Sequence, residues 1–244
     1  MAAPVPKTNE LFEALGSLSA EDELSLRRVE NKARKLIGVL PSGGHSVLGA
    51  VSAIRGDRER SIHHHEISVR LGADVAWWLS YCTSLAVLDD APKRLEVARR
   101  AIAQHADVNE LLDIAIGAAL ESAAFGDART LCDQWAKLNR RRHSAASVIG
   151  KLLHATENGL FSVTGVRGVL EVAREVGRAK GIQKTEQGRI SEPPGNALLW
   201  TFQVTASPSA AAELNEELAD QLAARDDLLE DPGQQLVVMF DGVT

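Results

Sequence analysis

Three consecutive histidines, His63, His64 and His65, form the densest cluster of potential metal ligands in the sequence. An ion held by one helix needs ligands at i and i+3 or i+4, because only those positions share a face. Successive side chains point about 100° apart, so the three imidazoles cannot converge on one ion. His63 and Glu66 have a suitable spacing, but two ligands do not close a structural site. We therefore predict no metal and no cofactor.

A run of arginines, Arg140, Arg141 and Arg142, could contact an anionic partner. Such a run is typical of a solvated helix end, where cations interact favourably with the helix dipole. The sharper interpretation is a contact for phosphate groups or for an acidic protein. The net charge of −6 gives the chain as a whole no attraction to nucleic acid or to an anionic membrane. We predict that the run is exposed and speeds association with an acidic partner.

A glycine pattern, Gly165-Val166-Arg167-Gly168, resembles the loop with which KH domains clamp a nucleic-acid backbone. KH domains also need strands before that loop, and the sequence offers none there. Together with the arginine run, the pattern supports an alternative prediction, a nucleic-acid-associated protein.

The two cysteines, Cys82 and Cys132, lie in apolar helical stretches without CxxC spacing. They are expected to be buried free thiols of a cytoplasmic protein. Neither has the surroundings of an activated nucleophile, and no GxSxG, P-loop or HExxH motif occurs. The first residues lack a signal-peptide pattern, and no apolar run is long enough to span a membrane. We predict that the chain is not an enzyme.

Helices must position these side chains, because the composition favours helix. Hydrophobic residues make up 45 % of the 244 residues, and alanine and unbranched side chains, which lose little entropy in a helix, are abundant. Residues 1–18 are expected to be a loose N-terminal tail. The first helix begins at Ser19, a good N-cap with an acidic residue three positions later. Three residues are expected to end that helix: Pro41, Gly43 and Gly44.

Short turns recur at a nearly constant spacing through the middle of the chain. Four turn dipeptides begin 33, 37 and 32 residues apart: Gly56-Asp57, Asp89-Asp90, Gly126-Asp127 and Asn158-Gly159. The segment from Ala53 to Asp74 also aligns without gaps over Ala86 to Asp107. A period near 34 residues predicts stacked helix pairs.

The first two units resemble tetratricopeptide repeats. The resemblance rests first on Leu48-Gly49, which precedes the first turn, and on two large residues early in the next helix, Trp78 and Tyr81. It also rests on three small residues in and after the following helix, Ala98, Ala101 and Ala106. The first unit departs from the pattern, with His65 and Ser68 where small residues are expected. The resemblance implies a right-handed α-solenoid of helix pairs over residues 19–182, with a concave surface that binds peptides.

Three aromatic residues, Trp77, Trp78 and Tyr81, lie on the helix that would line this concave surface. Adjacent tryptophans cannot both point inward, so one is expected to pack between units and the other to be exposed as a binding anchor. We predict that these three residues, with the arginine run, form the partner-binding site.

The hydrophobic period changes near the C-terminus. A polar segment over residues 183–196 is expected to be a linker, and after it Leu198, Trp200, Phe202 and Val204 alternate with more polar residues, as in a half-buried strand. Ser207-Pro208 predicts a helix start, and Leu236 to Phe240 predicts a second strand. Residues 197–244 therefore form a βαβ module. No other strand is evident to complete its sheet, so we predict a homodimer through the C-terminal strands.

The sequence thus predicts a mainly α protein, a tetratricopeptide-like α-solenoid followed by a small C-terminal βαβ module. Its expected function is protein or peptide recognition, as an adaptor or regulatory subunit.

Overall fold

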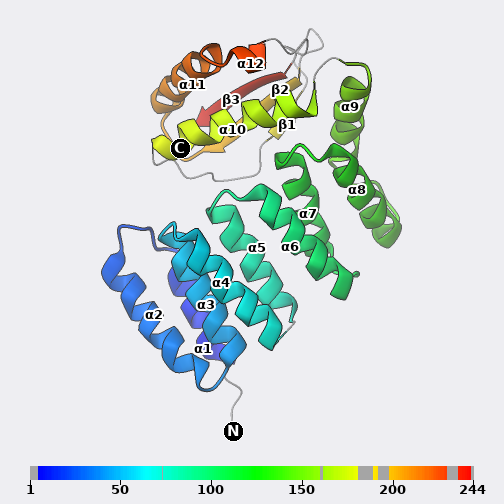
Figure 1. Cartoon of the computed structure of the whole chain (residues 1–244). Helices are drawn as coiled ribbons and strands as arrows, with labels where there is room; N and C mark the ends of the chain where they lie inside the picture. The colour runs from blue at the N-terminus through cyan, green and yellow to red at the C-terminus, as the bar shows by residue number, and fades with distance from the viewer. Residues whose placement is uncertain are drawn as a thin grey trace. The chain divides into compact units, whose positions relative to one another are not determined.

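A computed structural model describes residues 5–72, 74–159, 162–180, 189–191, 198–229 and 236–242. The chain divides into two compact units, residues 1–114 and 115–244. The elements are shown in Figure 1. In chain order they are α1 (Val5–Leu15), α2 (Glu23–Ile37), α3 (Pro41–Ile54), α4 (Arg58–Leu71), α5 (Val75–Val87), α6 (Ala91–Gln104), α7 (Asn109–Glu121), α8 (Phe125–Asn139), α9 (Ala146–Glu157), α10 (Val163–Ala179), β1 (Arg189–Ser191), β2 (Leu198–Val204), α11 (Pro208–Ala223), α12 (Asp226–Leu229) and β3 (Leu236–Gly242).

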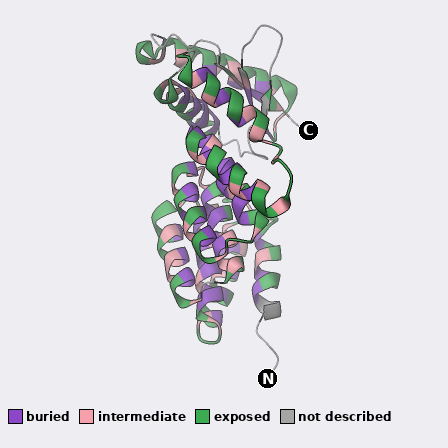
Figure 2. Cartoon of the chain, turned by 90° about the vertical axis from the view of Figure 1, so that its right-hand side faces the viewer, coloured by how far each residue is buried: buried purple, intermediate pink, exposed green. Residues whose placement is uncertain are grey.

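The first unit is a stack of helix pairs. Helix α3 packs against α1, α2, α4 and α5, and α5 packs against α3, α4 and α6. Each of these two helices therefore contacts its pair mate and the equivalent helix of a neighbouring pair, as expected for repeats that bury their apolar faces against neighbours. Between residues 42 and 180, the described part of the chain contains no strand, as predicted. Buried and exposed faces alternate along the helices (Figure 2).

The turns inside successive helix pairs have the same geometry. Each has one residue in the left-handed region, namely Gly56 at φ 74°, Asp89 at φ 52° and Ala123 at φ 53°, which are 33 and 34 residues apart. The amide of the following residue bonds the carbonyl five positions back in all three turns, and the bond lengths are 2.8–2.9 Å: Asp57 to Ser52, Asp90 to Leu85 and Ala124 to Ala119. This is the Schellman motif. The predicted period is confirmed.

The third turn lies three residues earlier than predicted. Gly126-Asp127 is not a turn but part of the first turn of α8, and Ala123 holds the left-handed position instead. The prediction relied on glycine, which adopts this conformation without steric cost. The observed spacing is more regular than the predicted one.

The glycines of α3 form close helix contacts and do not end a helix, contrary to the prediction. Pro41 is the first residue of α3, and Gly43 and Gly44 are buried within it. A Cβ added at Gly44 would lie 2.6 Å from the Ile37 side chain, and one added at Gly49 would lie 2.5 Å from the His65 ring. Small residues on α3 therefore let α2 and α4 approach it closely.

The N-terminal segment is a helix and not a loose tail. In α1, Leu11 and Leu15 are buried and join the apolar core of α2 and α3, which also includes Leu26, Val29, Ala33, Leu36, Val47, Leu48 and Val51. Their spacing of four residues places both leucines on one helix face. The helix is held by this burial.

In the second unit, β2 and β3 are parallel and are connected through α11, which confirms the βαβ module. Leu198 pairs with Leu236 and Trp200 with Val238. A third strand, β1, pairs antiparallel with β2 and lies inside the segment predicted to be a linker. The expectation that no further strand completes the sheet is therefore wrong.

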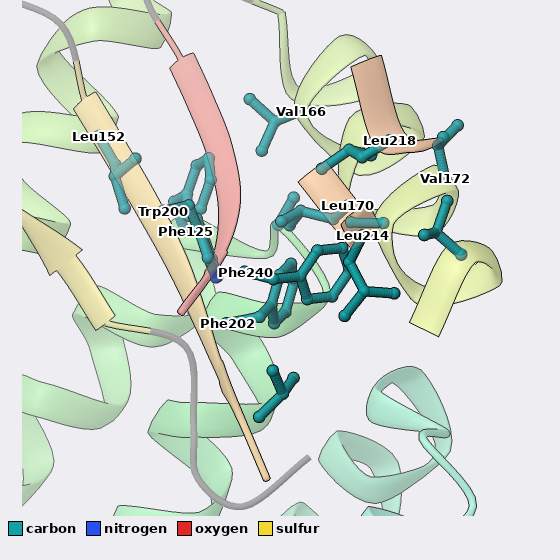
Figure 3. Close-up of a cluster of buried hydrophobic side chains, with 14 of the residues drawn as sticks. Phe125, Leu152, Val166, Leu170, Val172, Trp200, Phe202, Leu214, Leu218 and Phe240 are labelled. Carbon is teal, nitrogen blue, oxygen red and sulfur yellow. The ribbon is translucent and has the colours of Figure 1, made fainter. Parts of the chain in front are cut away.

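One face of this sheet carries the core of the second unit. Trp200, Phe202 and Val204 alternate along β2 and are buried, as the period of two predicts. Figure 3 shows Phe202 and Phe240 near the leucines of α11, and the two rings lie 5.8 Å apart. The cluster also takes in Leu152, Val166, Leu170, Leu214 and Leu218.

Candidate interaction surfaces and the polar core of the first unit

The three aromatic residues predicted to bind a partner have different environments on α5. Trp78 is 2 % exposed and Tyr81 is fully buried, whereas Trp77 is half-buried. The Trp77 indole lies beside the end of α4, because a Cβ added at Gly72 would be 3.6 Å from its Nε1 atom. Trp78 is packed, as expected for one of the two tryptophans, but Trp77 is half-buried where an exposed ring was expected. Trp78 and Tyr81 have no surface with which to contact a partner, contrary to the prediction, so only Trp77 of the three remains a candidate.

Trp78 and Tyr81 take part in a polar network that joins α4, α5 and α6. The Arg100 guanidinium donates to both carboxylate oxygens of Glu66, at 2.7 and 3.0 Å. The Tyr81 hydroxyl donates to the same carboxylate at 3.2 Å, and the Arg100 guanidinium lies 5.3 Å from the centre of the Trp78 ring. The Arg100 hydrogen bonds lower the pKa of Glu66, and burial raises the pKa of Tyr81.

A second set of polar side chains is buried between α3, α4 and α5. The His65 ring stacks on Tyr81, with centroids 4.9 Å apart, and its Nε2 lies 2.8 Å from the Ser84 hydroxyl. The Ser68 hydroxyl donates to the Ser42 carbonyl at 2.8 Å. Burial lowers the pKa of His65 to about 3, so the ring is neutral at pH 7. These contacts explain both departures from the repeat pattern, because Gly49 leaves the space that His65 fills.

The pair of Ser84 and His65 has only part of the geometry of a catalytic dyad. Within the described residues, the Nδ1 atom of His65 has no hydrogen-bond partner, so no acid orients the ring. Both side chains are buried, and His65 is fully so. The arrangement is suited to packing two helices together.

The two cysteines are buried and form no disulfide with each other, as predicted. Burial raises the pKa of the Cys82 thiol to about 12. A protonated thiol is a poor nucleophile and a poor metal ligand. Across the part of the chain that the structure describes, no group of three or more His, Cys, Asp or Glu side chains could hold a metal ion.

The arginine run follows α8 and is exposed, as predicted. Arg140 ends the helix in the left-handed conformation, at φ 55°. Arg141 lies over the Trp135 ring, 5.2 Å from its centre, and the His143 ring meets the same indole edge-on at 5.0 Å. The run is therefore anchored at its middle by an aromatic contact, and Arg140 and Arg142 flank this anchor.

The glycine pattern at residues 165–168 is part of α10 and not a loop, so the KH-like interpretation is wrong. The Gly165 amide donates to the Ser162 hydroxyl at 2.8 Å, which caps the helix. A Cβ added at Gly168 would lie 2.5 Å from the Leu228 side chain. The backbone amide at position 165 therefore takes part in the helix cap, and Gly168 leaves room for Leu228.

His64 faces a histidine that no motif in the sequence singles out. Its Nδ1 atom lies 3.1 Å from Nδ1 of His45, and the exposed His63 ring is 5.4 Å from the His64 ring. Burial lowers the pKa of both members of the pair, that of His64 to about 4. His45 lies in a different helix, so no spacing rule within one helix could have indicated the contact.

The side chain of Asn215 forms hydrogen bonds with the main chain of Phe240 at the outer edge of β3. The Phe240 amide donates to Oδ1 of Asn215 at 2.7 Å, and Nδ2 of Asn215 donates to the Phe240 carbonyl at 3.0 Å. In a strand, the N–H and C=O of one residue point toward the same edge. Asn215 of α11 therefore takes the place of a neighbouring strand at this residue.

Comparison of the chain with protein-family models, with curated proteins and with solved structures finds no match. None of the helices in the described ranges is both long and apolar enough to cross a membrane.

Proposed function

We propose that this chain is a protein- or peptide-binding adaptor or regulatory subunit whose first unit presents tetratricopeptide-like helix pairs to its partner. The observation that carries this proposal is the recurrence of one Schellman turn at Gly56 and Asp89, 33 residues apart in the first unit, together with the packing of α3 and α4 against α5. Repeats of this kind build extended surfaces from equivalent positions of successive units. The usual use of such a surface is the recognition of another protein or a peptide.

Trp77 is the proposed anchor of the contact. Tryptophan is enriched at binding hot spots, because a large rigid ring buries much area at little cost in conformational entropy. The ring lies next to the end of α4, where Leu71 has an exposed fraction of 57 %. A partner side chain placed over Trp77 would therefore meet further apolar surface.

A peptide-display selection against the intact chain tests this proposal, because a random library samples partner sequences without one being chosen in advance. Selected peptides should lose about 2 kcal/mol of binding free energy, or about 30-fold in Kd, with Trp77→Ala. Val87→Ala is a matched control, since Val87 is 55 % exposed at the other end of the same helix. A selection that yields no binder, or binders indifferent to Trp77→Ala, contradicts the proposed surface.

The alternative function, nucleic-acid association, now depends on the arginine run alone. Its support is the exposed Arg140 and Arg142 on either side of the contact between Arg141 and Trp135. Binding to single-stranded RNA or DNA, followed by fluorescence anisotropy at several salt concentrations, tests it, because phosphate contacts weaken steeply with salt. Replacing all three arginines with glutamine should abolish such binding and spare the peptide binding of the first unit.

A further inference from the structure

His45 and His64 face each other across the helix pair of α3 and α4. Their Nδ1 atoms are 3.1 Å apart, and their ring centroids are 5.3 Å apart with planes tilted by 36°. Both side chains are half-buried. Each side chain is therefore partly enclosed by its neighbours and partly open to solvent.

Two imidazole nitrogens at this distance match one edge of a metal coordination polyhedron. With metal–nitrogen bonds of about 2.0–2.1 Å, two ligands are about 2.9 Å apart at a right angle and about 3.4 Å apart at the tetrahedral angle. The observed separation of 3.1 Å lies between these values. We propose that His45 and His64 form a binding site for one transition-metal ion of the class of Zn²⁺, Ni²⁺ and Cu²⁺.

Close packing of the two helices pre-organises this pair. Gly49 lies one turn after His45 on α3, and its missing side chain admits the His65 ring, to which an added Cβ would come within 2.5 Å. His65 directly follows His64 on α4. The contact between Gly49 and His65 is thus close to both proposed ligands. Because the two histidines are already held near each other, metal binding costs less conformational entropy.

Binding of the ion requires a change of tautomer and a rotation of the rings that turns both Nδ1 lone pairs toward one point beside the line joining them. In the neutral pair, one Nδ1 donates a hydrogen bond to the other. When the ion enters, the donor ring carries its proton on Nε2, so both Nδ1 lone pairs are available. The nearby Arg34 and Arg60 are each paired with an acid, Glu30 at 2.6 Å and Asp57 at 3.5 Å, which offsets part of their repulsion of a cation.

The ligand set defines which ions the site takes. Imidazole suits zinc, copper and nickel, whereas Mg²⁺ and Ca²⁺ require oxygen ligands. The described residues add no third His, Cys, Asp or Glu to the pair, so water completes the coordination. The site is therefore expected to bind its ion exchangeably and to link α3 to α4 when loaded.

Calorimetric titration of the full chain, prepared without a histidine tag, tests the proposal. Zn²⁺ and Ni²⁺ should bind at one ion per chain and raise the melting temperature, whereas Mg²⁺ should do neither. His45→Ala and His64→Ala should each weaken binding about tenfold or more. His63→Ala is the matched control, because His63 is exposed and adjacent in sequence; it should change the affinity less than about threefold. Equal losses in His63→Ala and His64→Ala overturn the proposal, as does the absence of saturable binding to the wild type.

A measurement on the wild type keeps the proposal testable if either variant fails to fold. Substoichiometric Cu²⁺, which is paramagnetic, should first broaden the backbone amide resonances of α3 and α4 around the two histidines. Broadening that centres on another histidine of the chain overturns the assignment.

Discussion

The side-chain amide of Asn215 forms both hydrogen bonds with the main chain of Phe240 that a further strand would form. An unpaired edge strand is a template for pairing with another chain, and proteins commonly block such edges. The other edge of the sheet is the short strand β1. The predicted homodimer depends on a sheet that lacks partners, and within the described residues this sheet has a third strand and a bonded outer edge.

Asn215→Ala should lower the free energy of unfolding by about 2 kcal/mol, because it leaves the amide and carbonyl of Phe240 unpaired. It should also promote self-association, which light scattering at several concentrations measures. Glu216→Ala, at the exposed neighbouring position of α11, is the control. Light scattering of the wild type at micromolar concentration tests the homodimer directly. If the wild type is already a dimer and Asn215→Ala does not change its mass, the Asn215 side chain does not prevent β3 from pairing with another chain.

Gly49→Ala should destabilise the chain by about 1–3 kcal/mol, because the added methyl group meets the His65 ring. The sign of this change in unfolding free energy separates two effects, because in an exposed helix interior the same substitution stabilises the protein by up to about 1 kcal/mol. Gly150→Ala in α9, where an added Cβ meets nothing within 4 Å, should show that gain. Urea unfolding followed by circular dichroism measures both. Combining Gly49→Ala with His65→Ala should cost less than the sum of the two changes; strict additivity would exclude the steric explanation.

A double-mutant cycle with Glu66→Gln and Arg100→Gln should give a coupling energy of about 1 kcal/mol. The geometry is bidentate, but Arg100 is 40 % and Glu66 26 % exposed, so solvent screens much of the attraction. The exposed pair of Arg27 and Glu23, four residues apart on α2, should give a smaller coupling, because solvent screens it more fully. Equal couplings for the two pairs would contradict the assigned role of Glu66 and Arg100 in joining successive helix pairs.

The thiol of Cys82 should be inert in the folded protein at pH 8, because burial raises its pKa from 9.0 to about 12. The buried, protonated thiol contributes fully to the free energy of unfolding below pH 9. This contribution is lost as the pH rises toward 12, because only the thiol of the unfolded chain ionises in that window. Titration with a thiol reagent before and after adding urea measures this difference. Rapid reaction of both cysteines in native buffer would contradict their burial.

Turn chemistry makes the repeats predictable where the sequence obeys it. Gly56 and Asp89 are residue types that tolerate the left-handed conformation, and both turns lie where the sequence predicts them. Ala123 holds the same conformation without being such a type, so the sequence points to the next Gly-Asp instead. The short strand β1 escapes prediction because three residues among prolines and glycines show no period.

The candidate sites are less accessible to prediction, because most depend on contacts between different helices. The spacing within α4 correctly predicts that His63 and His65 point in different directions. It contains no information about His45, which lies on α3. The same holds for the pairing of Glu66 with Arg100, whose 34-residue separation becomes meaningful only once the repeat is folded. In contrast, the exposure of the arginine run follows from its charge alone.

The polar contacts of the first unit also bear on how quickly it folds. Its cross-helix hydrogen bonds join residues close in sequence, 19 positions apart for His65 and Ser84 and 34 for Ser46 and Ser80. Each helix pair can therefore close a short loop and then serve as the template for the next, so the first unit has the low contact order of fast-folding helical proteins. The pairing of β2 with β3 closes a loop of similar length, 38 residues from Leu198 to Leu236, and the helix α11 lies within that loop. Until α11 has formed and Asn215 has reached Phe240, the apolar β3 strand lacks the side chain that later bonds its edge.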